Sequence, residues 1–98
     1  MTLEKYTAND YFKMFKKWGL DRGIIQNANP LAQTLKLGSE FGELCDNMAK
    51  GRHEAAKDDI GDMLVVIAQV CAMIGTTPAE CMATAWDDIK DRKGYLNS

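Results

Sequence analysis

Residues 59–74 read DIGDMLVVIAQVCAMI, and their apolar side chains indicate the fold class. After Asp62 nearly every position is apolar, so a helix over this stretch would be apolar on all sides. Such a helix needs neighbours on all sides, because exposed apolar surface is unfavourable in water. We therefore predict a central helix over about residues 54–74. The other predicted helices are too short to surround it, so we predict that dimerisation completes the core.

Three further helices are predicted outward from this segment, and strand signals are nearly absent. They are residues 8–18 after the cap Thr7, residues 30–50 after the cap Asn29, and residues 78–93 after the cap Thr77. Glycines at positions 19, 51 and 94 are the predicted stops. The sequence of residues 77–80, TPAE, is that of a capping box. The chain is thus predicted to be an all-α, four-helix bundle.

Length, charge and composition exclude several classes of protein. A chain of 98 residues allows one domain, predicted to span residues 1–98. A net charge of −2 gives no positive field for nucleic acid, so no nucleic-acid partner is expected. Three cysteines without a CxxC pair argue against structural zinc, and we expect free buried thiols. The start lacks an apolar signal segment and the apolar run at 63–74 is too short for a bilayer, so we expect a soluble cytoplasmic protein without a membrane partner.

Two pairs of acidic residues lie beside the apolar stripes of the second and third predicted helices. Glu40 and Glu43 are three residues apart, as are Asp59 and Asp62, so each pair shares a helix face. The face of the two aspartates continues into apolar residues further along the same helix. The aspartates therefore point along an apolar ridge rather than clearly into water.

The four carboxylates could meet at one end of two antiparallel helices. Ionised together in a partly dry site they would repel one another, and bound cations would relieve that repulsion. An all-oxygen set of ligands suits Mg²⁺, with Mn²⁺ as an alternative, and such sites bind triphosphates readily. A second interpretation stays open, in which the carboxylates are solvated charges whose spacing arose by chance.

The order and spacing of these motifs resemble the MazG-like nucleotide pyrophosphohydrolases. That family carries an ExxE motif followed by ExxD, and the matching segments here are residues 40–43, EFGE, and, fifteen residues later, residues 59–62, DIGD. The segments LKLGSEFGEL, DDIGDMLVVI, IKDRKG and WGLDRGI resemble the same family, so the likeness covers nearly the whole chain. The chain departs from the pattern at Asp59, where the family has the longer glutamate.

The resemblance implies an all-α hydrolase that forms a tight homodimer or a dimer of dimers. It implies a nucleotide pyrophosphatase, which converts a nucleoside triphosphate to the monophosphate and pyrophosphate. By match to the signature, the metal-binding residues for Mg²⁺ would be Glu40, Glu43, Asp59 and Asp62. Glu40 or Glu43 would be the catalytic residue that orients the attacking water, and the sequence does not choose between them.

Six further residues are candidates for substrate binding: Lys36, Lys90, Arg92 and Lys93 for the phosphates, and Trp18 and Arg22 for the base. Each has a plainer interpretation. Lys36 could pair with Glu40 one turn away, and the basic residues near the end of the last helix could complement its dipole. Trp18 shares a face with other aromatic residues, which favours a place in the core. Trp86 is expected to pack, and Gly61 is expected to permit close packing of a neighbouring helix.

Two other functions compete with this prediction. Phosphoribosyl-ATP pyrophosphohydrolase has a similar fold and chemistry, and an assay with that substrate would separate the two. The other is a catalytically silent helical dimer that acts as a binding or regulatory module. In that case the carboxylates would be solvated, and Mg²⁺ would not raise the melting temperature.

Overall fold

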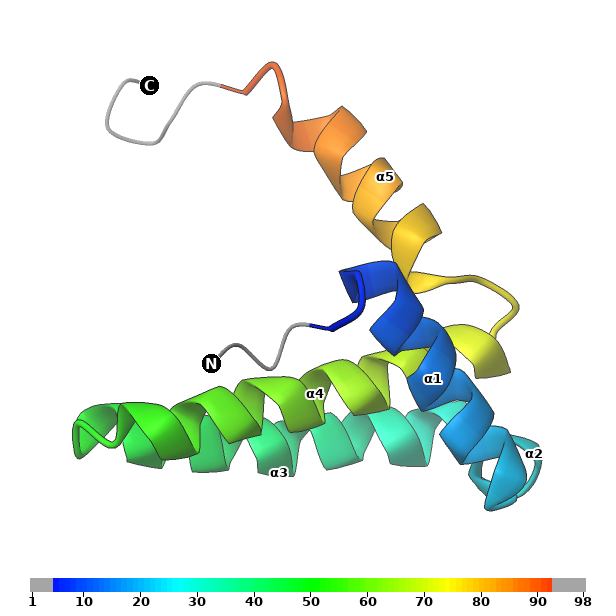
Figure 1. Ribbon diagram of the computed structural model, residues 1–98. Coiled ribbons are helices and arrows are strands. Elements are labelled where there is room, and N and C mark those ends of the chain that lie inside the picture. The colour runs from blue at the N-terminus through cyan, green and yellow to red at the C-terminus, as the bar shows by residue number, and fades with distance from the viewer. Residues whose placement is uncertain (1–4, 93–98) are drawn as a thin grey trace.

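A computed structural model describes residues 5–92, and over that range the chain is all-helical (Figure 1). The helices are α1 (Ala8–Asp21), α2 (Ile24–Asn27), α3 (Pro30–Ala49), α4 (His53–Met73) and α5 (Pro78–Ile89). The prediction of an all-α chain is confirmed. The four long helices correspond to the four expected, whereas α2 lies in a segment expected to be a loop.

Side-chain caps explain where α1, α3 and α5 begin, whereas α4 starts without one. Thr7 and Asp10 form a complete capping box at α1, in which each side chain accepts from the other residue's backbone N–H at 3.1 Å. The complete box was expected at α5 instead. There Thr77 Oγ1 accepts from Glu80 N at 3.1 Å, but the Glu80 carboxylate accepts from the Thr76 hydroxyl, so only half of the box forms.

Gly19 does not end the first helix, contrary to the prediction. α1 runs on to Asp21, and Gly19 is buried where α1 meets α2 and α4. A Cβ at this position would lie 3.0 Å from Ile25 Cδ1 and 3.2 Å from Gln69 Cγ. The chain turns at Gly23 instead, whose φ of 72° is a left-handed conformation that glycine adopts without steric cost.

α3 and α4 lie side by side in antiparallel directions and form the main body of the chain (Figure 1). A hydrogen bond joins them toward each end: Gln33 Nε2 donates to Gln69 Oε1 at 2.9 Å, and Asn47 Nδ2 donates to Asp59 Oδ2 at 2.6 Å. The least exposed residues of α3 recur at spacings of four and three, and they are Gln33, Leu37, Glu40, Leu44 and Asn47. This is the repeat of helices that pack along their length.

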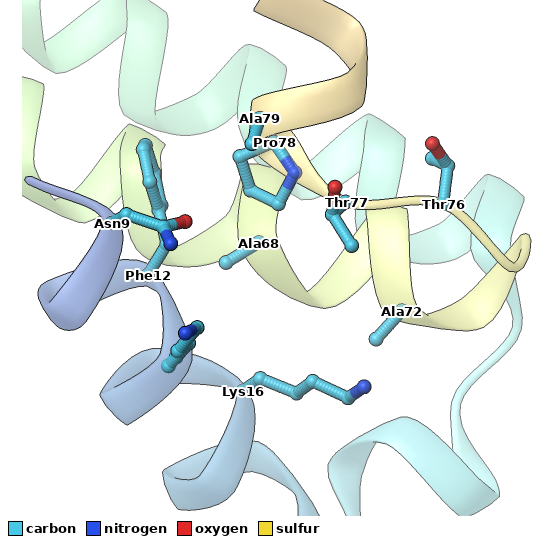
Figure 2. A pocket seen from close by; sticks show the side chains of 10 residues that line it. Asn9, Phe12, Lys16, Ala68, Ala72, Thr76, Thr77, Pro78 and Ala79 are labelled. Carbon is cyan, nitrogen blue, oxygen red and sulfur yellow. The ribbon is translucent and has the colours of Figure 1, made fainter.

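α5 projects away from the α3–α4 pair and contacts only α1 and α4 among the described elements (Figure 1). From Ala79 onward every residue of α5 is exposed. Trp86, which was expected to pack, is 62% exposed. A hollow of about 260 Å³ opens where α1, α4 and the start of α5 meet, with Phe12 and Lys16 on one side and Ala68 on another (Figure 2).

The core of the single chain is small. Its buried apolar residues are Ala56, Val66, Ala68 and Cys71, and no large side chain of residues 5–92 is fully buried. Exposed large apolar side chains lie on every long helix, and those on α3, α4 and α5 are Leu31, Leu35, Phe41, Met48, Ile60, Leu64, Met82, Trp86 and Ile89, with Ile74 just after α4. Only one of the three thiols is buried, because Cys45 and Cys81 are exposed. The central helix is thus not surrounded within one chain.

Membrane spanning was also assessed for the described part of the chain. No individual helix there combines the length and apolar character needed to cross a bilayer. α4 and α5 meet that requirement only as a pair, across a bend of 98°.

Candidate functional site

The two acidic motifs lie on the two helices that form the main body. α3 carries Glu40 and Glu43, and α4 carries Asp59 and Asp62. Glu40 is one of the residues at which α3 is least exposed, and Asp62 is half-buried on α4. Because the helices are antiparallel, Glu40 and Asp62 both fall between the two hydrogen bonds that join α3 to α4.

The carboxylates are close enough to disturb one another's ionisation. Burial raises the pKa of Glu40 above its ordinary value of 4.5, and the charges of Glu43, Asp62 and Asp59 raise it further. The pKa of Asp62 is raised above 3.8 in the same way, first by burial and then by aspartates on its own helix. Lys36 opposes both shifts, so its ammonium group lies near both carboxylates.

Asp59 differs from the other three acidic residues because it is enclosed. It is 6% exposed, and its Oδ2 accepts a hydrogen bond of 2.6 Å from Asn47 Nδ2. No role was predicted for Asn47 from the sequence. The structure thus adds a residue that orients one of the four carboxylates.

A ready-made metal site is not present in residues 5–92. Within that range no three Asp, Glu, His or Cys side chains are grouped so that they could hold a metal ion. Their chemistry nevertheless fits a hard divalent cation, since all the donors are carboxylate oxygens and two of them are held where their charged forms are disfavoured. A cation that drew them together would relieve that cost.

A cavity of about 240 Å³ lies next to the acidic residues. Its wall is formed by four helices, and the lining residues are Trp18, Ile24, Lys36, Glu40, Asp62, Val65, Val66 and Gln69. A neighbouring hollow of about 300 Å³ shares Trp18, Asp62 and Val65 with it. The hollow in Figure 2 shares no lining residue with this cavity and contains no carboxylate. Acidic, basic, aromatic and apolar groups therefore meet in one place.

Trp18 lines this cavity and does not belong to the core as expected. It is 42% exposed, and the Arg22 guanidinium carbon lies 4.5 Å from the centre of its ring. This is the distance of a cation–π contact, which fixes the orientation of both side chains. An aromatic face at the rim of a cavity can stack on a planar ring.

Lys36 also lines the cavity, and no ion pair joins it to Glu40 within 4 Å among the residues described. The simple pairing that the sequence allowed is therefore not formed. Its ammonium group is left available to a ligand in the cavity.

The basic residues at the end of α5 are not brought to the cavity of the same chain. Lys90 Nζ lies 2.7 Å from Asp87 Oδ1, and an Arg92 guanidinium nitrogen lies 2.6 Å from Asp88 Oδ2. Both pairs are local to α5, which makes no contact with α3. Lys93, the third of these candidates, lies outside the described residues.

Gln33 and Gln69 are the residues of this region that were missed. Gln33 is 8% exposed and Gln69 is 2% exposed, and the two form the hydrogen bond at one end of the α3–α4 pair. One signal in the sequence could have identified Gln33. On α3 the polar residues Gln33, Glu40 and Asn47 are each seven apart, so they share a face.

Comparison with known proteins identifies a similar phage protein but no family or solved structure. No family model matches the chain, and no solved structure matches it. It is similar to a protein of Haemophilus phage HP1 described as an uncharacterized 18.2 kDa protein in the rep-hol intergenic region, with 42% identity over 55 residues. The match covers 56% of this chain and 34% of that protein, so it takes in about a third of the phage protein's length.

Proposed function

We propose that this protein is a Mg²⁺-dependent nucleoside triphosphate pyrophosphohydrolase with a MazG-like bundle. The observation that carries the proposal is the meeting of Glu40 from α3 and Asp62 from α4 in one cavity beside Lys36 and Trp18. Carboxylates suit a divalent cation, a lysine suits phosphate, and an aromatic face suits a base. These three requirements of a nucleotide are met within one small volume.

In the proposed reaction, water attacks the α-phosphorus. The bond between this phosphorus and the oxygen that bridges it to the β-phosphate breaks. Pyrophosphate leaves and the nucleoside monophosphate remains. Glu40 or Glu43 accepts a hydrogen bond from the attacking water and takes its proton. Mg²⁺, held by Glu40, Glu43, Asp59 and Asp62, would neutralise the charge of the phosphates.

The other residues of the cavity position the substrate. Lys36 places its charge beside the phosphates, and Asn47 holds the Asp59 carboxylate in a fixed orientation. Trp18, itself held by Arg22, presents its ring to the base. The apolar side chains Val65 and Val66 exclude water from the wall between these two ends.

Measurement of the released phosphate species tests the proposal. The purified chain is incubated with Mg²⁺ and a panel of ribo- and deoxynucleoside triphosphates together with phosphoribosyl-ATP, and pyrophosphate is scored against orthophosphate. We expect pyrophosphate and monophosphate, with activity reduced by at least about a hundredfold in Glu40→Gln and Asp62→Asn. Glu54→Gln, an exposed acid in the first turn of α4, is the control and should retain full activity.

A binding or regulatory module without catalytic activity is the second candidate. It is favoured by one observation, the lack of a preformed metal-binding group within residues 5–92. In that case no substrate of the panel would release pyrophosphate with either Mg²⁺ or Mn²⁺. Millimolar Mg²⁺ would also leave the melting temperature unchanged, because a ligand that does not bind cannot stabilise the folded state.

We also propose that the active form is a homodimer or a dimer of dimers. Support comes from the apolar side chains exposed along α3, α4 and α5, which include Phe41, Leu64 and Trp86. Exposed apolar surface is unfavourable in water, and association with a second chain would remove it from water. A second copy of the chain would cover α4 on the side that α1 and α3 leave open.

A further inference from the structure

One end of the cavity carries a polar group that the proposed hydrolysis does not use. Gln69 is 2% exposed and lines the cavity at the end opposite Asp62 on the same helix face. Its Oε1 accepts from Gln33 Nε2 at 2.9 Å, but its Nε2 is a buried donor without a hydrogen-bond partner. An unpaired buried donor is unfavourable, and a ligand atom that accepted its hydrogen bond would remove that cost.

The packing around Gln69 holds its side chain in place. A Cβ added at Gly19 would lie 3.2 Å from the Gln69 Cγ, so α1 packs closely against one side of the Gln69 side chain. On another side, Gln33 of α3 donates a hydrogen bond to the Gln69 Oε1. A donor that is fixed in this way can discriminate between ligands, because it pays little entropy when it binds.

The distance along α4 matches the layout of a nucleotide. Asp62, Val65 and Gln69 lie on one stripe, and the seven residues from Asp62 to Gln69 span about 10 Å. If the acidic end holds the phosphates, as the proposed function requires, the carboxamide end lies a sugar's length away. Trp18 of α1 lines the same cavity, where it can stack on a base.

We propose that Gln69 reads the base of a pyrimidine nucleotide, and that its Nε2 donates a hydrogen bond to a carbonyl oxygen of the ring. The inference rests on the proposed function, since it takes the acidic end as the phosphate end. Every pyrimidine base carries a carbonyl at C2 and adenine carries none, so the donor excludes adenine; guanine carries a carbonyl at C6, and only its larger size argues against it. The cavity is small, at about 240 Å³, and a pyrimidine has one ring where a purine has two, so the smaller class of base fits it better.

Binding of nucleoside monophosphates tests this inference without requiring turnover. Trp86→Phe leaves Trp18 as the sole tryptophan, and its fluorescence reports stacking in the cavity. Titrations use deoxycytidine, deoxyuridine and deoxyadenosine monophosphates in the presence of Mg²⁺. In this background we expect both pyrimidine nucleotides to bind at least about tenfold more tightly than the adenine nucleotide, the ratio that about 1.4 kcal/mol supplies.

Two substitutions separate the donor from the hydrogen bond between the glutamines. Gln69→Leu removes the donor, and we expect it to weaken pyrimidine binding about tenfold while adenine binding stays the same. Gln33→Leu breaks the same glutamine pair but keeps the Gln69 carboxamide, and it should retain the base preference. Equal affinity for all three nucleotides, or a preference that survives in Gln69→Leu, would overturn the inference.

NMR of the parent chain provides a measurement that does not depend on the folding of a variant. The side-chain amide signals of Gln69 should shift on addition of deoxycytidine monophosphate and not of deoxyadenosine monophosphate, and signals that stay fixed with both would refute the assignment. The outcomes also separate this inference from the proposed function. Selective binding without pyrophosphate release would support the base site and contradict the proposed activity. Pyrophosphate release without base preference would support the activity and contradict the base site.

Discussion

Glu40 and Asp62 are the residues whose ionisation the fold disturbs, and the direction of the shift has consequences for stability. Both pKa values are raised in the folded chain, first by burial and then by neighbouring carboxylates. The folded state therefore keeps these protons to higher pH than the unfolded state does. The stability that results is present below the ordinary carboxyl pKa and is lost as the pH rises through the raised pKa. At neutral pH both carboxylates oppose folding.

Glu40→Gln should accordingly raise the melting temperature at pH 7 in the presence of a chelator. The amide has the shape of the carboxyl group but no charge to desolvate. The gain should disappear below about pH 4, where the parent carboxyl is protonated in both states. Thermal melts at both pH values measure the effect, with Glu54→Gln as the control, which should show no such gain because Glu54 is an exposed acid in the first turn of α4. Mg²⁺ should then stabilise the parent more than the variant, and a lower melting temperature for Glu40→Gln at pH 7 would contradict this account.

At the scale of elements, two helical glycines show how packing alters the effect of one methyl group. Gly19 of α1 is pressed against α2 and α4, where a Cβ would lie 3.0 Å from Ile25 and 3.2 Å from Gln69. Gly61 of α4 has nothing within 4 Å of that position, so the close packing expected there does not occur within the chain. The same substitution should therefore have opposite effects at the two positions.

We expect Gly61→Ala to stabilise the monomeric chain by about 0.5–1 kcal/mol, because alanine loses less backbone entropy than glycine in a helix. Gly19→Ala should destabilise it by about 1–3 kcal/mol, since the methyl group must displace two neighbouring side chains. Urea unfolding at low protein concentration measures both changes. Destabilisation by Gly61→Ala that grows with protein concentration would instead place a second chain against α4 at that glycine.

At the scale of the whole molecule, the chain has more apolar surface than it can bury alone. A domain of 98 residues buries a smaller fraction of its surface than a larger domain does, and here no large side chain of residues 5–92 is fully buried. α5 has little support within the chain, because it touches only α1 and α4 and exposes Trp86 and Ile89. These features set the conditions under which association would stabilise the fold.

We expect light scattering to give at least twice the mass of one chain at micromolar concentration. The melting temperature should rise with protein concentration, because association stabilises only the folded state. Trp86→Glu places a charge on the exposed face of α5 and should shift the population toward monomer. A chain that stays monomeric up to high micromolar concentration, with a melting temperature independent of concentration, would rule out the dimer.

Much of the helical architecture could be predicted from local signals. The caps Thr7, Asn29 and Thr77 lie at the starts of α1, α3 and α5, as predicted, because a side-chain oxygen three residues before a free backbone N–H satisfies it whatever the tertiary fold. The acidic motifs of α3 and α4 could be recognised for the same reason, since residues three apart share a helix face in any helix. These features depend only on chain segments a few residues long.

The tertiary structure decided which groups meet across helices. Phe41 and Met48 of α3 are apolar and yet 55% and 53% exposed, while the polar Gln33 lies against α4. Apolar character alone identifies only part of the face that lies against α4, because hydrogen bonds across the pair make buried polar residues acceptable. The unpaired Gln69 donor, the Asn47 contact and the place of Trp18 in the cavity all depend on residues far apart in the sequence, and no local pattern specifies such distances.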